Sequence, residues 1–155
     1  MILVIAGTNP FCFNRLLRPM DDWARRSGAD VFAQIGNSSF EPHCMRFERF
    51  VERDTMLSLI DEAEIVVSHG GFGSLRDCLS AGKRVVAVPR YSHLDECLDN
   101  QEELVQALET ARRVIGVYDI STLEDGLERA RGFLPSSSEN SRIPSLIEEF
   151  LQRCH

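Results

Sequence analysis

Short apolar runs alternate along the chain with longer segments of helical spacing. Bounded apolar runs of the kind that buried parallel strands show occupy residues 1–6, 31–35, 65–67, 85–88 and 114–117, with a shorter candidate at 47–51. Between them, apolar side chains recur with helical spacing at residues 16–27, 55–63, 74–81, 100–110 and 122–131. Strands separated by helices in this order predict right-handed crossovers and a doubly wound, parallel α/β sheet.

Glycine and acidic residues mark the ends of several predicted helices. Gly28 and Gly82 stand where a helix stop is expected, because glycine adopts the left-handed conformation that closes a helix. Asp54 directly precedes residues 55–63, where its carboxylate can accept from the first free backbone N–H groups. The folded domain predicted in this way spans residues 1–131.

A tail follows this domain. Residues 132–141 contain Pro135 and a serine triplet, and this composition predicts a flexible linker. In residues 142–155 one apolar helical stripe is formed by Ile143, Leu146, Ile147, Phe150 and Leu151. This helix can pack back on its own domain or dock onto a partner subunit, and the sequence leaves both open.

Charge, apolar runs and cysteine spacing disfavour several classes of protein. The formal net charge is -7 and Lys and Arg form no long block, which disfavours nucleic acids and anionic membrane surfaces. No apolar run approaches the roughly 20 residues of a membrane-spanning helix, and the first six residues predict a strand, not a signal peptide. The five cysteines are odd in number and lack C-x-x-C spacing, so we expect no disulfide framework, no metal site and a reducing cytoplasm.

The strongest chemical signal is the turn at residues 68–74, Ser-His-Gly-Gly-Phe-Gly-Ser, between a predicted strand and a predicted helix. Its three glycines remove Cβ atoms where a ligand must approach the backbone, although tight packing alone can also require them. The following helix offers unpaired N–H groups and a partial positive charge, which suit a diphosphate. The spacing is not that of a P-loop, and a dinucleotide fingerprint would follow the first strand instead.

Other polar residues follow the predicted strands, at the edge where parallel sheets bind ligands. Asp77 lies one turn into the helix after the glycine-rich turn, where it can reach ribose hydroxyls or merely complement the helix dipole. His69 can donate to a phosphate or a sugar hydroxyl, or can be a structural side chain. A second polar group, at Arg90, Glu96 and residues 99–101, suits sugar hydroxyls or helix capping.

The chain resembles the C-terminal, donor-binding domain of family 28 glycosyltransferases. The resemblance is carried by the order of the motifs at residues 66–77, 81–83, 86–90 and 100–101. Further residues, at 7–8, 13–16 and 34–36, are similar to the small catalytic subunits of two-component UDP-sugar transferases of bacterial exopolysaccharide synthesis. The eukaryotic subunit that adds the second N-acetylglucosamine to the dolichol-linked oligosaccharide is a more distant relative. The resemblance covers nearly the whole chain and implies the Rossmann-like half of a GT-B, inverting, metal-independent enzyme that needs no cofactor.

The resemblance also implies roles for individual residues. The turn would hold the UDP diphosphate, Asp77 the ribose, the backbone near Val51 the uracil, and Gln101 the donor sugar. Arg90 could meet a donor carboxylate, a phosphate or solvent, and His69 and Glu96 are the candidates for the catalytic base. The residues expected to contact the UDP-sugar are Gly7, Thr8, Asn14, Gly36, Phe50, Val51, Ser68, His69, Gly70, Gly71, Phe72, Gly73, Ser74, Asp77, Arg90, Glu96, Asn100 and Gln101.

One departure from the family pattern concerns histidine. Relatives usually have Glu-His and then Asp-His-Gln, where this chain has Glu96-Cys97 and then Asp99-Asn100-Gln101. No role that depends on those histidines carries over. The donor therefore stays open among glucuronic acid, galactose, glucose and N-acetylglucosamine.

The length of the chain allows one of the two domains that form a GT-B cleft. The resemblance implies that a separate membrane-anchored subunit binds the lipid-linked saccharide acceptor and holds this chain at the inner face of the membrane. A non-catalytic nucleotide-sugar sensor or scaffold is the alternative. A flavodoxin-like domain is disfavoured, because its phosphate loop would follow the first strand.

Overall fold

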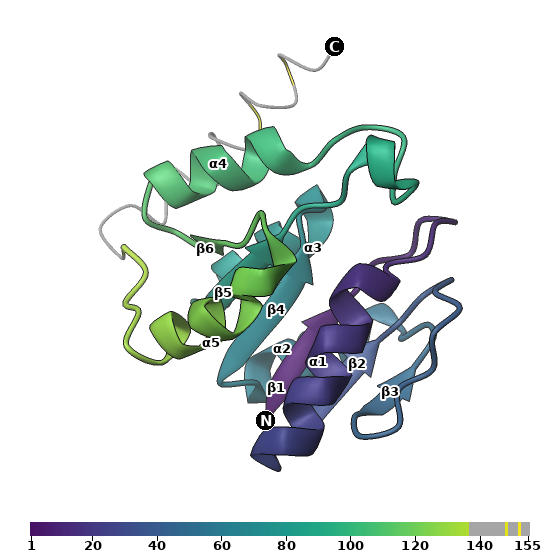
Figure 1. Ribbon diagram of the computed structural model, residues 1–155. Helices are drawn as coiled ribbons and strands as arrows, with labels where there is room; N and C mark the ends of the chain where they lie inside the picture. Colours follow the sequence, from purple (N-terminus) through teal and green to yellow (C-terminus); the bar gives the residue numbers. More distant parts are fainter. Residues whose placement is uncertain (137–147, 149–151, 153–155) are drawn as a thin grey trace.

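The computed structural model describes residues 1–136 and positions 148 and 152. Its described strands form one parallel sheet in the order β3-β2-β1-β4-β5-β6 (Figure 1). The strands are β1 Ile2–Ile5, β2 Val31–Gln34, β3 Arg46–Glu48, β4 Ile65–His69, β5 Arg84–Val88 and β6 Ile115–Gly116. The predicted doubly wound, Rossmann-like fold is confirmed.

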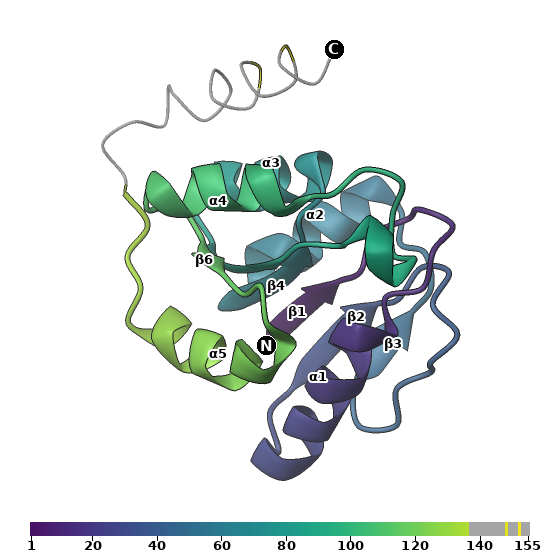
Figure 2. The ribbon, with the colours of Figure 1, turned by 45° about the horizontal axis from the view of Figure 1, so that its top comes forward.

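Helices cover both faces of the sheet (Figure 2). The α-helices are α1 Asn14–Ser27, α2 Arg53–Glu62, α3 Phe72–Ser80, α4 Glu102–Thr110 and α5 Leu123–Arg131, with short 3-10 turns at η1 Ser92–Leu94 and η2 Ile120–Thr122. Helices α1 and α5 pack on one face and α2, α3 and α4 on the other. Side chains of β4 alternate between the two layers, since Val67 joins the first and Val66 the second.

Several observed boundaries of helices and strands differ from the predicted ones. Asp54 lies inside α2, not ahead of it, and Glu52 takes the N-cap position without a side-chain cap. Helix α3 begins at Phe72, so the third glycine of the turn, Gly73, is already helical. The third strand ends at Glu48, which leaves residues 50 and 51 in a loop. Gly28 and Gly82 both adopt the left-handed conformation expected of helix stops, with φ of 67° and 69°.

A buried carboxylate that the sequence did not single out fixes the loop before β3. Asp21, on α1, accepts from the backbone N–H groups of His43, Cys44 and Met45 at 3.1, 2.7 and 3.1 Å. Charged hydrogen bonds of this kind are worth about 1.5–3 kcal/mol each. They hold the loop that leads into the edge strand against α1, and so help to place the residues that follow β3.

Residues 132–136 of the predicted linker are described. The N–H of Phe133 donates to the carbonyl of Ala130, and its partly buried side chain packs on the α1–α5 layer. Residues 137–141 and most of the predicted helix 142–155 lie outside the described residues, so both stay predictions. In the described part of the chain, no helix has the length and apolar character needed to cross a bilayer.

Candidate functional site

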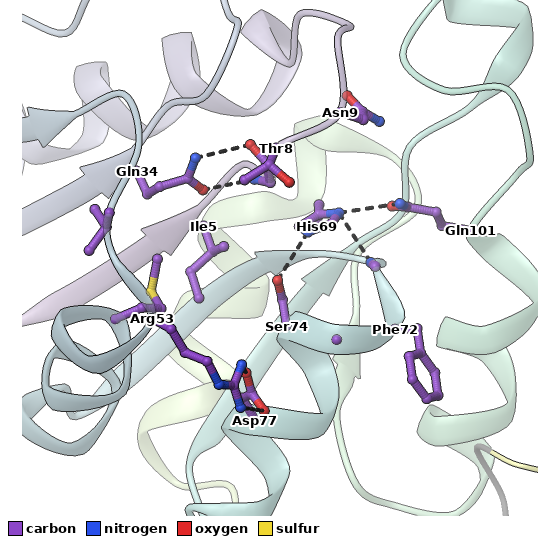
Figure 3. A pocket seen from close by; sticks show the side chains of 15 residues that line it. Ile5, Thr8, Asn9, Gln34, Arg53, His69, Phe72, Ser74, Asp77 and Gln101 are labelled. Atoms are coloured by element: carbon purple, nitrogen blue, oxygen red, sulfur yellow. Dashed lines mark hydrogen bonds and ion pairs between the residues drawn. The ribbon is translucent and has the colours of Figure 1, made fainter.

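A pocket of ≈ 460 Å³ opens at the carboxyl ends of β1 and β4 (Figure 3). The strand order reverses between these two strands, and ligands of doubly wound sheets bind at such a switch point. Three segments meet there: the loop after β1, the loop and first turn of α2, and the glycine-rich turn into α3. The lining residues are Ile5, Gly7, Thr8, Asn9, Gln34, Val51, Arg53, Met56, His69, Gly71, Phe72, Gly73, Ser74, Asp77 and Gln101.

The pocket brings together part of the predicted site. Among the residues expected from the sequence, those that line it are Gly7, Thr8, Val51, His69, Gly71, Phe72, Gly73, Ser74, Asp77 and Gln101. Those that do not are Asn14, Gly36, Phe50, Ser68, Gly70, Arg90, Glu96 and Asn100. Lining residues that the sequence did not indicate are Ile5, Asn9, Gln34, Arg53 and Met56.

The glycines in and beside the pocket are explained by different physical causes. A Cβ on Gly71 would overlap the His69 ring, and one on Gly70 would lie 2.8 Å from Cβ of Gln101. Gly7 has a φ of +94°, and its Cβ would lie 2.7 Å from Nε2 of His69. Packing and backbone conformation therefore require these three. Gly73 differs, because its φ is not positive and a Cβ would meet no described atom within 4 Å.

His69 sits at the end of β4 with both ring nitrogens engaged. The N–H of Gly71 donates to Nδ1 at 3.2 Å, and Nε2 lies 3.2 Å from Oγ of Ser74. A backbone N–H can only donate, so Nδ1 carries the lone pair and Nε2 the proton. Burial, aided by the positive charge of Arg90, lowers the pKa of His69 to about 3. The imidazole is therefore neutral and a donor at Nε2, an arrangement that disfavours the role of catalytic base.

Asp77 faces the pocket from α3 and is paired with Arg53 of α2. Nη1 of Arg53 lies 3.1 Å from Oδ2, and Nη2 lies 3.4 Å from Oδ1. Figure 3 shows the two side chains facing each other. The Asp77 side chain is 15% exposed and that of Arg53 is 65% exposed, so the guanidinium can move away while the carboxylate stays. The pair spans 24 residues in sequence, and no local pattern connects its members.

The loop after β1 is held by a buried amide. Oε1 of Gln34 accepts from the N–H of Gly7 at 2.9 Å, and its Nε2 donates to the carbonyls of Gly7 and Arg49 at 3.0 and 2.8 Å. Gln34 is 1% exposed. A buried polar side chain needs such partners, so an amide in an apolar strand was the signal that could have revealed it.

Arg90, for which the sequence left a donor carboxylate, a phosphate or solvent as partners, is buried and does not line the pocket. It is 1% exposed and donates to the carbonyls of Ala6, Phe11, Cys12 and Glu96. Burial lowers the pKa of Arg90 to about 10, which leaves the guanidinium charged at neutral pH. Arg90 therefore joins the loop after β1 to the turn around η1.

Glu96, the second candidate base, is likewise committed to structure. Its Oε1 lies 2.7 Å from Nε of Arg15, and its Oε2 accepts from the N–H of Tyr91 at 3.0 Å. The residue is 4% exposed. The carboxylate thus ties α1 to the segment after β5, and Glu96 does not line the pocket.

Four further predicted residues have contacts that explain them without a ligand. Asn14 bonds Ser39 and the N–H of Phe40. Asn100 accepts from the N–H of Ser92 at 2.7 Å. Gly36 packs against the carbonyl of Gly7, and the buried Ser68 donates to the carbonyl of His69. Phe50, by contrast, is 54% exposed in the loop beside the pocket.

Metal ligation has no ready site in the described residues. No group of three His, Cys, Asp or Glu side chains there could hold an ion.

Comparison with known proteins identifies the family. The glycosyltransferase family 28 C-terminal domain matches residues 1–150. The chain belongs to this family. No curated protein matches it.

Solved structures with the same fold include longer glycosyltransferases. The glycotransferase of kitacinnamycin superposes with a TM-score of 0.63 at 16% identity, covering 96% of this chain and 38% of that one. CalG4, the calicheamicin glycosyltransferase, gives 0.64 at 15% identity, over 97% and 38%. MurG of Acinetobacter baumannii gives 0.63 at 15%, over 98% and 48%. The chain thus has the fold of a GT-B C-terminal domain and spans less than half the length of these enzymes.

Proposed function

We propose that this chain is the donor-binding, catalytic subunit of an inverting glycosyltransferase that takes its sugar from a UDP-sugar. The acceptor is a lipid-linked saccharide of exopolysaccharide or capsule synthesis, presented by a membrane-anchored partner at the cytoplasmic face. The observation that carries the proposal is the open space at Gly73, in the first turn of the helix that faces the switch-point pocket. Membership in the family supports a nucleotide-sugar donor as the ligand of this pocket.

The diphosphate is assigned to the first turn of α3. The backbone bond from Leu75 N–H to the carbonyl of Gly71, 3.1 Å long, is the first to close the helix. The three preceding N–H groups, of residues 72–74, lack such a partner because of their position, and the helix dipole adds a partial positive charge. Such a terminus binds phosphates through backbone donors, which favours a glycine at the point of closest approach.

The nucleoside is assigned to the side of the pocket formed by α2. The N–H and carbonyl of Val51 make no hydrogen bond to any described residue, and Val51 lines the pocket. One donor and one acceptor side by side complement the carbonyl and N–H of uracil. Asp77 then accepts from the ribose hydroxyls once Arg53 turns aside, and the freed guanidinium remains near the diphosphate.

The transfer itself needs a base from elsewhere. An acceptor hydroxyl oxygen attacks the anomeric carbon, the bond from that carbon to the phosphate oxygen breaks, and UDP leaves while the hydroxyl loses its proton. The contacts of His69 and Glu96 leave neither free to take that proton. The partner subunit therefore supplies the base together with the acceptor.

Asp77→Ala should weaken UDP binding by about ten- to a hundredfold, because a charged hydrogen bond contributes about 1.5–3 kcal/mol. The fold should persist, since Arg53, the partner of Asp77, is 65% exposed, and ion pairs screened by solvent contribute little. Isothermal titration with UDP and 2′-deoxy-UDP tests the ribose contact. The native chain should bind 2′-deoxy-UDP more weakly than UDP, whereas the variant should bind the two nucleotides with the same affinity. The exposed Asp54→Ala serves as control. Equal binding of both nucleotides by the native chain would remove the ribose assignment.

The purified chain should bind UDP-sugar yet transfer little sugar, and turnover should appear when the membrane-anchored partner is added. Radiolabelled sugar transfer to a lipid-linked acceptor measures both states. Robust transfer by the chain alone would contradict the two-subunit arrangement. Binding without transfer in the reconstituted pair would point to the sensor or scaffold alternative instead.

A further inference from the structure

Gln101, just ahead of α4, does not have a free amide in the pocket. Its Oε1 accepts from the backbone N–H of Arg90 at 3.1 Å, and its Nε2 lies 3.2 Å from Nδ1 of His69. The two contacts use opposite ends of the amide (Figure 3 shows the second). The backbone donor at Arg90 fixes which end is oxygen, because an N–H cannot accept.

These hydrogen bonds form a connected series in which the donor and acceptor of every bond are fixed. Arg90 N–H donates to Gln101, and the Gln101 amide donates to Nδ1 of His69, as does Gly71 N–H. Nε2–H of His69 must then donate to Oγ of Ser74. The series starts at two backbone N–H groups, which can only donate. The direction of the later hydrogen bonds therefore cannot be reversed by placing the side-chain protons differently.

Ser74, the last member of this series of hydrogen bonds, keeps a free donor. Ser74 receives a hydrogen bond at Oγ, which leaves its hydroxyl proton to donate elsewhere. The residue lies in the first turn of α3 and lines the pocket. A hydroxyl oriented as a donor, beside backbone N–H groups, favours an anion there and disfavours a cation.

We infer that Gln101 is a positioning residue for the leaving diphosphate: together with the N–H of Gly71, it holds His69 in the Nε2–H tautomer, which orients the hydroxyl of Ser74 as a donor to the phosphate. This role differs from a direct contact with the donor sugar, which would use the second lone pair of Oε1 or the second N–H of Nε2. The ligand in this statement rests on the proposed function, whereas the tautomer does not.

The tautomer is tested without any ligand. Long-range ¹H–¹⁵N correlation spectra of the ¹⁵N-labelled chain distinguish an imidazole protonated at Nε2 from one protonated at Nδ1, and His69→Gln identifies the signals. We expect His69 to be neutral and protonated at Nε2 at pH 7. Protonation at Nδ1 in the native chain would overturn the inference, whatever the chain binds.

The role is tested by comparing UDP with a UDP-sugar. Gln101→Met removes both hydrogen bonds and should weaken both ligands by the same factor, about three- to tenfold. In a His69→Ala background the same change should have no effect, because Gln101 acts through His69. Gln106→Met, an exposed glutamine of the same helix, is the matched control. If Gln101→Met fails to fold, Gln101→Glu keeps the acceptor for Arg90 N–H and replaces only the donor to His69.

Two results would contradict this role. Loss of affinity for the UDP-sugar alone, with UDP binding unchanged, would show a sugar contact. Equal losses in the presence and absence of the His69 side chain would show that Gln101 acts independently of it. No UDP binding by the native chain would overturn the proposed function instead, and the tautomer assignment would stand.

Discussion

Replacing Arg90 with methionine should lower the free energy of unfolding by about 3–5 kcal/mol, the range for removing one partner from a buried charged network. Methionine keeps an apolar stem beside the Phe13 ring, over which the guanidinium lies at 4.5 Å. It cannot donate to the buried carbonyls of Ala6, Phe11 and Glu96. Each carbonyl left without a donor costs about 1–3 kcal/mol. Urea unfolding followed by circular dichroism measures the loss.

Two variants make this result interpretable. Arg90→Lys retains the charge but not the planar fork, so its loss of stability should lie between those of the native chain and Arg90→Met. Arg25→Met, at a side chain that is 62% exposed, should change stability by less than about 0.5 kcal/mol. Unchanged stability of Arg90→Met, together with reduced UDP-sugar affinity, would restore the sequence-based assignment of Arg90 to the ligand.

The case of Arg90 illustrates why sequence predicted the fold better than the site. Each strand and helix is encoded by contiguous side chains, so the doubly wound order followed from periodicity alone. The glycine-rich turn is also local, and five of its seven residues line the pocket. Arg90 and Glu96 follow a strand, where ligand contacts are common, and only the folded loop after β1 reveals that they face inward.

Several contacts in and around the pocket join residues that are far apart in the sequence. Gln34 reaches Gly7 across 27 residues, Arg15 reaches Glu96 across 81, and Arg53 reaches Asp77 across 24. No hydrophobic period encodes such pairs, because one polar side chain satisfies another only after the strands are ordered. The predicted start of helix α3 was wrong for a local reason. The helix begins at Phe72 although Gly73, in its first turn, has a low helix propensity that favours a later start.

Gly73→Ala should have opposite effects on stability and on binding, a combination that separates the needs of the fold from those of a ligand. Alanine favours a helix over glycine by about 0.5–1 kcal/mol, and its Cβ would meet no described atom within 4 Å. Thermal unfolding should therefore occur at a higher temperature. The same Cβ would stand between the backbone of α3 and a bound diphosphate, so UDP affinity should fall by about ten- to a hundredfold, the loss of one charged hydrogen bond.

The control for this substitution is Gly132→Ala, at the end of α5. It makes the same chemical change at another glycine with open space and a φ of -100°, away from the residues that line the pocket. UDP affinity should be unchanged there, as measured by isothermal titration. If Gly73→Ala also bound UDP normally, the ligand of this pocket would not approach the backbone of α3. The open position would then lose its functional meaning, because no described contact requires a glycine at residue 73.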